Sequence, residues 1–292
     1  MGYKIVTTTL IIGCGYLGHH VAQRLHRQAG HEVFASTRRP ERAAALSALG
    51  IPSTSIDLDD VSPPAIPLPN TPYRLLYLVA PPPNGEFDTR LSRVLSLLAK
   101  KPPAHIVYVG TSGVYGDCGG RWVDETAIPQ PNNARARRRL HAEQQLHQWC
   151  MRHHCSRTLL RVSGIYGPDR LPIERIRQTR PVVAPLEAPW SNRIHIEDLS
   201  AICIAALNRI GHDELFNVSD GNPSSSSEFI LAVADAQGLP RPPTTTLGAA
   251  LSTASPAERV YLTESRRLDN RLLIEKLGIE LRYPTFSSTN TR

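Results

Sequence analysis

The stretch that decides the fold is residues 7–18, which read TTTLIIGCGYLG. Residues 7–12 form an apolar, β-rich run and predict a buried strand. After the glycines, Leu17, Val21 and Leu25 recur at every fourth position, which is the spacing of an apolar helix face. The segment therefore predicts a strand, a glycine-rich turn and a helix in immediate succession.

The turn itself has the spacing G-x-G-x-x-G. Between a strand and a helix, the first glycine of this pattern permits a tight turn, the second lets a pyrophosphate approach the backbone, and the third lets helix and strand pack closely. The helix N-terminus adds amide donors and a partial positive charge. A glycine turn without a ligand is the alternative, which the combination of strand, spacing and helix disfavours. We expect a dinucleotide to be held by Gly13, Gly15, Tyr16, Leu17 and Gly18.

The end of the expected second strand indicates which dinucleotide binds. Residues 33–39 read VFASTRR, without the acidic residue that an NAD site usually places about twenty positions beyond the first glycine. Thr37, Arg38 and Arg39 stand there instead, and a guanidinium can hold a 2′-phosphate with paired hydrogen bonds. The sequence thus favours NADP(H). NAD(H) stays open, because only four of the 33 Lys and Arg residues are lysine and pairs of arginine are therefore common.

Strands and helices alternate along the rest of the chain. We expect strands over 31–36, 53–57, 75–80, 105–110, 158–162 and 215–218, and helices over 41–49, 87–98, 132–154, 196–206 and 264–277. This order predicts an α/β fold, a Rossmann-type doubly wound parallel sheet of about seven strands with a smaller C-terminal lobe. The serine run 224–227 is expected to cap a helix. The expected domains are 1–170 for dinucleotide binding and 171–286 for a substrate lobe interleaved with the last strand, with a disordered tail at 287–292.

The composition predicts a globular protein of the cytoplasm. Of 292 residues, 41% are hydrophobic and 20% charged, and no apolar run approaches the roughly eighteen residues that cross a bilayer. We expect no signal peptide and no myristoylation, and the five irregularly spaced cysteines fit reduced thiols. The net charge of +7 is scattered, so we expect a small-molecule substrate, no nucleic acid and no membrane, while a homo-oligomer stays open. His147, Cys150 and His154 share a helix face, but their spacing fits no zinc pattern and no metal is expected.

Several segments together resemble the extended short-chain dehydrogenase/reductase superfamily, and within it the NAD-dependent epimerase/dehydratase group. Beside the glycine turn, the similar segments are YLVA at 77–80, VGTSGVYG at 109–116, LRVSGIYGP at 160–168, RIHIEDL at 193–199, FNV at 216–218 and RLDN at 267–270. The resemblance implies that Asp57 contacts the adenine, with a turn carboxylate as its alternative, and that Val79 and Ala80 border the cofactor. It also implies that Thr111 orients a substrate carbonyl or alcohol.

The family's YxxxK pair is absent from this sequence. In the family the tyrosine carries the proton, and the lysine lowers its pKa and holds the nicotinamide ribose. None of the four lysines has a tyrosine four positions earlier; they are Lys4, Lys100, Lys101 and Lys276. Counting back from Glu143, which resembles a landmark of the family's helix, puts Arg135 at the tyrosine position and Arg139 at the lysine position. The chain thus resembles an atypical branch that lacks the pair.

The missing pair leaves the chemistry open. Arginine stays protonated and cannot act as a base, although Arg139 could still hold the ribose as a cation. Tyr115 and Tyr166 are candidate proton donors by residue type, with packing as their alternative. Arg135 could clamp an anionic substrate or lie on a solvated helix face.

Two functions follow from these residues. The first is an enzyme, an NADP(H)-favouring oxidoreductase or epimerase-like protein that moves hydride to or from a small hydroxyl or carbonyl substrate with a non-standard proton donor. The second is a catalytically inactive dinucleotide-binding sensor or scaffold. Thr111 favours the enzyme, whereas Arg135 and Arg139 favour the sensor. The sequence leans toward the enzyme and identifies no substrate.

Overall fold

The computed structural model describes residues 6–62 and 66–286, which divide into two compact units. Among the described residues, the first unit comprises 6–62, 66–111, 134–161 and 199–216, and the second comprises 112–133, 162–198 and 217–286. The units do not divide at residue 170. Residues 112–133 and 162–170, before that position, lie in the second unit, and residues 199–216, after it, lie in the first. The tail expected at 287–292 falls outside the described residues.

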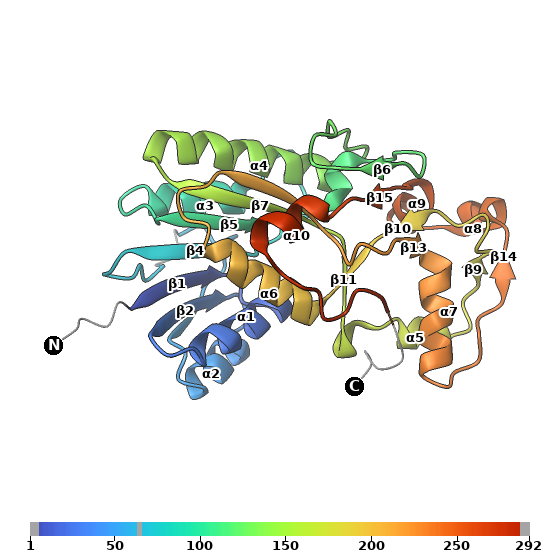
Figure 1. The fold of residues 1–292 in the computed structure, drawn as a ribbon, viewed down its shortest axis with the longest axis horizontal. Coiled ribbons are helices and arrows are strands. Elements are labelled where there is room, and N and C mark those ends of the chain that lie inside the picture. Colours follow the sequence, from blue (N-terminus) through green and yellow to red (C-terminus); the bar gives the residue numbers. More distant parts are fainter. Residues whose placement is uncertain (1–5, 63–65, 287–292) are drawn as a thin grey trace. The chain divides into compact units, whose positions relative to one another are not determined.

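A seven-stranded sheet organises the first unit, with the strand order β12-β7-β5-β4-β1-β2-β3 (Figure 1). Its strands are β1 (Thr7–Ile12), β2 (His31–Thr37), β3 (Ser53–Ser55), β4 (Tyr73–Tyr77), β5 (His105–Val109), β7 (Ser156–Val162) and β12 (Glu214–Val218). Each neighbouring pair from β3 to β7 is parallel. The chain order reverses at β1, which pairs with both β2 and β4, and doubly wound sheets bind their ligands at such a point. The predicted Rossmann-type fold is confirmed.

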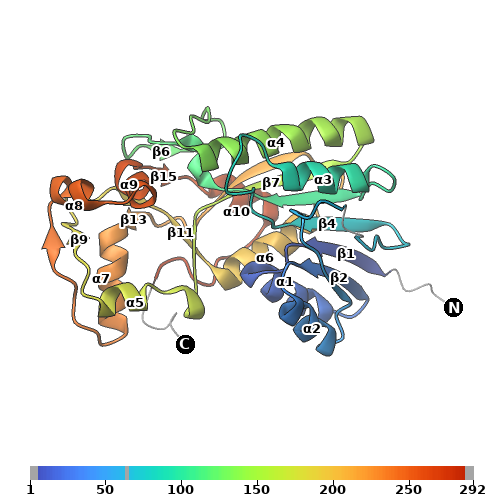
Figure 2. The same ribbon diagram turned by 180° about the vertical axis from the view of Figure 1, so that it is seen from behind.

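Helices cover both faces of this sheet. Figures 1 and 2 show α1 (Tyr16–His26), α2 (Pro40–Ala48) and α6 (Ile196–Leu207) on one face and α3 (Thr89–Leu98) and α4 (Ala134–His153) on the other. The buried residues of α3 form the predicted stripe, namely Leu91, Val94, Leu95 and Leu98. The helix begins later than expected, because the Asp88 carboxylate accepts a hydrogen bond from Leu91 N at 3.0 Å and caps the first turn. Phe87 therefore lies outside the helix.

The second unit is built from short elements. Its strands are β6 (Trp122–Val123), β8 (Gly164–Tyr166), β9 (Val182–Val183), β10 (Trp190–Ser191), β11 (Arg193–His195), β13 (Ser224–Ser225), β14 (Thr244–Thr245) and β15 (Arg267–Leu268). Its helices are α5 (Ile173–Arg177), α7 (Ser226–Ala236), α8 (Leu247–Thr253), α9 (Pro256–Thr263) and α10 (Arg271–Leu277). The strands pair two by two, as β10 with β13, β11 with β8, β14 with β9 and β15 with β6.

Two local predictions in this unit have different outcomes. The expected cap is confirmed, because Ser225 Oγ accepts from Glu228 N at 3.1 Å while Glu228 Oε2 accepts from Ser225 N at 2.6 Å. The expected helix over 264–277 is wrong in its first half, where β15 forms instead. Leu268 is fully buried there and its amide donates to Asn192 Oδ1 at 2.8 Å, so tertiary pairing overrides the local apolar period.

Candidate functional site

The glycine turn lies between β1 and α1, and its three glycines have three different surroundings. Gly13 has φ +91°, and a Cβ atom added there would lie 2.7 Å from Val79 Cγ2. A Cβ at Gly18 would lie 3.0 Å from Leu78 Cδ1. Around Gly15, only Arg42 Nη1 at 3.6 Å and the Gly13 carbonyl at 3.9 Å come within 4 Å of that position in the described structure. The turn, the close packing and the open approach that a dinucleotide motif requires are thus all present.

Helix α1 begins at Tyr16, directly after this turn. Its N-cap is Gly15, no side chain of the described residues caps it, and its first turn holds no acidic residue. Leu17 is buried, so only its backbone can face a ligand. A helix N-terminus of this kind binds phosphate through its amides and partial positive charge. The structure brings the expected cofactor residues of the turn together, and their geometry fits a diphosphate.

The end of β2 places the expected 2′-phosphate residues beside the turn. Thr37 is buried, and its hydroxyl accepts a hydrogen bond from Arg39 N at 3.4 Å, which ties the end of β2 to the residue before α2. Arg38 and Arg39 are exposed, and neither guanidinium has a hydrogen-bond or ion-pair partner among the described residues. Both cations are therefore available to an anion from solvent.

Arg42 is a third cation, which the sequence reasoning missed. It lies on the first turn of α2, with Nη1 3.6 Å from the position that a Cβ of Gly15 would take. Burial raises the pKa of the Cys14 thiol to about 12, against the opposing charge of Arg42, which disfavours the reactive thiolate form. The missed signal is the sequence Arg39-Pro40-Glu41-Arg42, because a proline at the first helical position sets Arg42 one turn from Arg39 on the same helix face.

The segments after β3 and β4 are tied together by Arg90 of α3. Asp57 Oδ1 accepts a hydrogen bond from Asp59 N at 2.9 Å, which is the turn role considered as its alternative. Asp59 forms an ion pair with Arg90, and the hydrogen bond from Arg90 holds the pKa of the Asp59 carboxyl below its usual range. Arg90 Nη1 also donates to the Ala80 carbonyl at 2.9 Å. The expected adenine contact and the end of β4 are thus held in one place.

Arg139 lies buried against the carboxyl ends of β4 and β5. Its Nη1 donates to the Val109 carbonyl and the Tyr108 hydroxyl, both at 3.2 Å, and to the Val79 carbonyl at 3.4 Å. Arg139 therefore places a fixed positive charge beside Val79, the residue that packs on Gly13.

A buried ion pair orients α4 so that Arg139 faces the sheet. Arg161 Nη2 lies 2.8 Å from Glu143 Oε2, and its Nε donates to the same oxygen at 3.2 Å. Burial raises the pKa of the Glu143 carboxyl, and the hydrogen bond from Arg161 opposes that rise. Glu143 follows Arg139 by one helical turn, so the pair fixes the face that both residues share.

The other candidate catalytic residues are placed differently. Thr111 follows β5 and is half-buried, and Arg135 is exposed on the first turn of α4. Tyr115 belongs to the second unit and is 2% exposed, and its hydroxyl donates to Asn217 Oδ1 at 2.7 Å. Tyr166 is also buried, with its ring 5.1 Å from that of His195. The geometry of both tyrosines matches the packing alternative.

Neither a metal cluster nor a membrane span occurs in the described part of the chain. Across residues 6–62 and 66–286, no group of three or more His, Cys, Asp or Glu side chains could hold a metal ion. No helix in these ranges is long and apolar enough to cross a membrane.

Comparisons with known proteins give a family match over part of the chain and a similar fold over nearly all of it. The model of the NAD dependent epimerase/dehydratase family matches residues 91–219. A conserved protein of unknown function from Silicibacter pomeroyi is 29% identical, with a TM-score of 0.84 over 98% of this chain and 97% of that one. A candidate NAD-dependent epimerase/dehydratase from Methylobacillus flagellatus is also 29% identical, with a TM-score of 0.69 over 96% and 94% of the two chains. No curated protein matches the sequence.

A more distant structure shows the same fold. The UDP-glucose 4-epimerase of Thermus thermophilus, solved in complex with NAD, is 19% identical, with a TM-score of 0.75 over 98% of this chain and 97% of that one. The match to the NAD dependent epimerase/dehydratase family thus covers residues 91–219, and the chain as a whole shares its Rossmann-type fold with this epimerase structure.

Proposed function

From the family match over residues 91–219 and the geometry of the glycine turn, we propose that the protein is an NADP(H)-dependent oxidoreductase or epimerase-like enzyme that acts on a small hydroxyl or carbonyl substrate. The observation that carries the cofactor preference is a set of three cations without an ion-pair partner among the described residues, Arg38, Arg39 and Arg42. Arg38 and Arg39 follow β2, which ends without an acidic residue, and Arg42 lies beside Gly15 of the glycine turn. A 2′-phosphate forms ion pairs with such a set as well as hydrogen bonds, whereas a free ribose hydroxyl carries no charge to pair with it.

The residues of the first unit have distinct tasks in this proposal. The glycine turn and the N-terminus of α1 bind the diphosphate, and Asp57 and Ala80 border the adenine. The nicotinamide, when bound, supplies or accepts a hydride. Arg139 takes the place of the family's lysine as the cation at the ribose, because three carbonyl and hydroxyl oxygens fix its Nη1 at the ends of β4 and β5.

Proton transfer is the step for which the chain departs from its family. Thr111 can polarise a substrate oxygen through its hydroxyl. Arg135 cannot serve as the base, because a guanidinium keeps its proton, but its exposed charge can bind an anionic group of the substrate. The proton then comes from another donor or from water.

Turnover of NADPH with a panel of aldehydes and ketones tests the proposal, with nicotinamide absorbance as the readout. We expect oxidation of NADPH with at least one substrate, and Arg139→Gln should lower kcat/KM by about ten- to a hundredfold through the loss of a charge-assisted contact. Arg137→Gln, on the exposed side of the same helix, is the matched control and should leave the rate unchanged.

A dinucleotide-binding sensor without turnover is the second candidate, favoured by one observation. The Tyr115 hydroxyl is buried and donates its hydrogen bond to Asn217 Oδ1. Its proton is therefore used in a structural hydrogen bond and not directed to a substrate. If NADPH binds tightly but no substrate of the panel is turned over, the function of a dinucleotide-binding sensor is favoured over that of an enzyme.

A further inference from the structure

Two of the chain's three tryptophans stack on one arginine at the surface of the second unit. Trp122 is 54% exposed and Trp190 is 41% exposed. The guanidinium carbon of Arg267 lies 5.4 Å from the ring centre of Trp122 and 5.0 Å from that of Trp190. Tryptophan and arginine with this much contact area are typical of binding surfaces.

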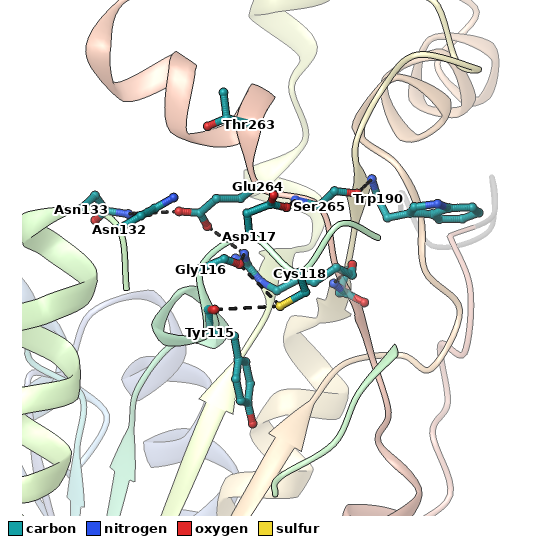
Figure 3. A network of polar contacts seen from close by, with 12 residues as sticks. Tyr115, Gly116, Asp117, Cys118, Asn132, Asn133, Trp190, Thr263, Glu264 and Ser265 are labelled. Carbon is teal, nitrogen blue, oxygen red and sulfur yellow. Dashed lines mark hydrogen bonds and ion pairs between the residues drawn. The ribbon is translucent and has the colours of Figure 1, made fainter. Parts of the chain in front are cut away.

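The backbone holds this stack in place. In the pairing of β6 with β15, Trp122 stands opposite Arg267, whose Nε donates to the Gly120 carbonyl at 2.7 Å. Trp190 N donates to Ser265 Oγ at 3.0 Å, and Figure 3 shows the Trp190 ring pointing away from the polar network around Ser265. Gly120 has φ +73°, and a Cβ there would lie 3.0 Å from Trp190 Cδ1. A ligand would therefore meet a surface that needs little ordering.

The charge of the stack indicates which ligand it suits. Neither Arg267 nor Arg121, which precedes Trp122, has an ion-pair partner within the described ranges. Arg267 already provides each ring with a cation, so a second cation would be repelled. The remaining indole surface favours a flat π-system, and the unpaired guanidinium favours an anion.

We propose that Trp122, Arg267 and Trp190 form a second ligand site, for a flat aromatic ring that carries a phosphate, as a nucleotide does. The ring stacks on indole, and the phosphate pairs with Arg267. This site goes beyond the proposed cofactor function, because all three residues belong to the second unit and the glycine turn belongs to the first.

Quenching of tryptophan fluorescence by UMP tests this site. The third tryptophan, Trp149, is buried in the first unit, so the exposed pair should dominate the response. We expect saturable quenching, with uridine and inorganic phosphate each binding more weakly than UMP. Trp122→Ala and Trp190→Ala should each weaken binding by about 5- to 100-fold, the effect of one lost stacking partner. Trp149→Phe, the matched control, should leave the affinity for UMP unchanged.

Three results would overturn the site. The first is the absence of quenching up to about 10 mM UMP, where even a weak specific site would respond. The second is equal quenching in the Trp122→Ala/Trp190→Ala double variant. The third is a single-stranded oligonucleotide that binds far more tightly than UMP, which would indicate a nucleic-acid surface instead. The double variant should bind NADPH as the wild type does, because the glycine turn is unchanged. If the wild type binds UMP at this site but does not bind NADPH, only the cofactor proposal is refuted.

Discussion

At the scale of single residues, Gly13 has the most restrictive position in the proposed cofactor site. Its φ of +91° disfavours a side chain, and an added Cβ would meet Val79 Cγ2 at 2.7 Å and Val79 N at 3.0 Å. We expect Gly13→Ala to lower the free energy of unfolding by about 2–4 kcal/mol, from backbone strain and overpacking together.

Urea denaturation measures this loss, and Gly248→Ala is its control. Gly248 lies within α8, and an added Cβ there would meet nothing within 4 Å. That substitution should be neutral or stabilising by up to about 1 kcal/mol, because alanine is the better helix former. Equal effects of the two substitutions would contradict the close packing of the turn.

His105 makes a pH-dependent contribution to stability. It is fully buried on β5, with Nδ1 2.8 Å from Ser156 Oγ and Nε2 3.1 Å from Thr158 Oγ1. Burial, assisted by the charge of Arg74, lowers its pKa to about 4. Below about pH 6.5 the unfolded chain therefore binds a proton that the folded chain does not, so stability is complete above that pH and falls as the pH approaches 4.

The pH effect can be isolated with a variant. Between about pH 7 and pH 5 the histidine should account for a loss of about 2 kcal/mol in the free energy of unfolding. His105→Asn should show a correspondingly smaller loss over the same interval in urea titrations. An identical pH dependence in both proteins would show that His105 is not the titrating group.

At the scale of elements, the capping box of α7 was legible in the sequence because it is local. Ser225→Ala removes the hydroxyl that accepts from Glu228 N and should cost about 1 kcal/mol in urea denaturation. Ser226→Ala, one residue later and inside the helix, should change stability by less than about 0.5 kcal/mol. If Ser226→Ala lowered the free energy of unfolding more than Ser225→Ala does, Ser225 would not be the N-cap residue of α7.

The orientation of α4 depends on the buried pair of Glu143 and Arg161. Arg161→Met leaves the carboxylate of Glu143 buried without its partner and should cost about 3–5 kcal/mol. Adding Glu143→Gln should recover most of that loss, because the carboxylate charge that lost its partner is then removed. Denaturation of the two variants checks this, and a double variant no more stable than the single one would contradict the pairing.

At the scale of the whole molecule, what could be predicted divides between local and tertiary signals. The glycine turn, the alternation of strands and helices in the first unit and the stripe of α3 follow from periodicity and spacing, and the structure has all three. The start of α10 could not be predicted, because Leu268 is drawn into a strand by a partner far away in the sequence. Arg42 was missed because its approach to Gly15 depends on how α2 packs on the sheet beside the glycine turn.

The proposed site was predictable to different depths. The glycine turn consists of consecutive residues, so its residues could be identified from the spacing of the glycines alone. The hydrogen bond of Tyr115 to Asn217 joins residues 102 positions apart, so no spacing rule could reveal that this hydroxyl is committed. The position of Arg139 could be counted from Glu143, but its three acceptors lie on other strands.

The central claim is that the glycine turn and its arginines bind NADP(H), and calorimetric titration with NADPH and NADH tests it most directly. We expect NADPH to bind at least about tenfold more tightly than NADH, and Arg42→Ala to remove most of that difference without weakening NADH, since only the 2′-phosphate contact is lost. Arg137→Ala should leave both affinities unchanged. The account would be contradicted if neither coenzyme gave a heat of binding. It would also be contradicted if NADPH and NADH bound with equal affinities that Arg38→Ala and Arg42→Ala did not alter.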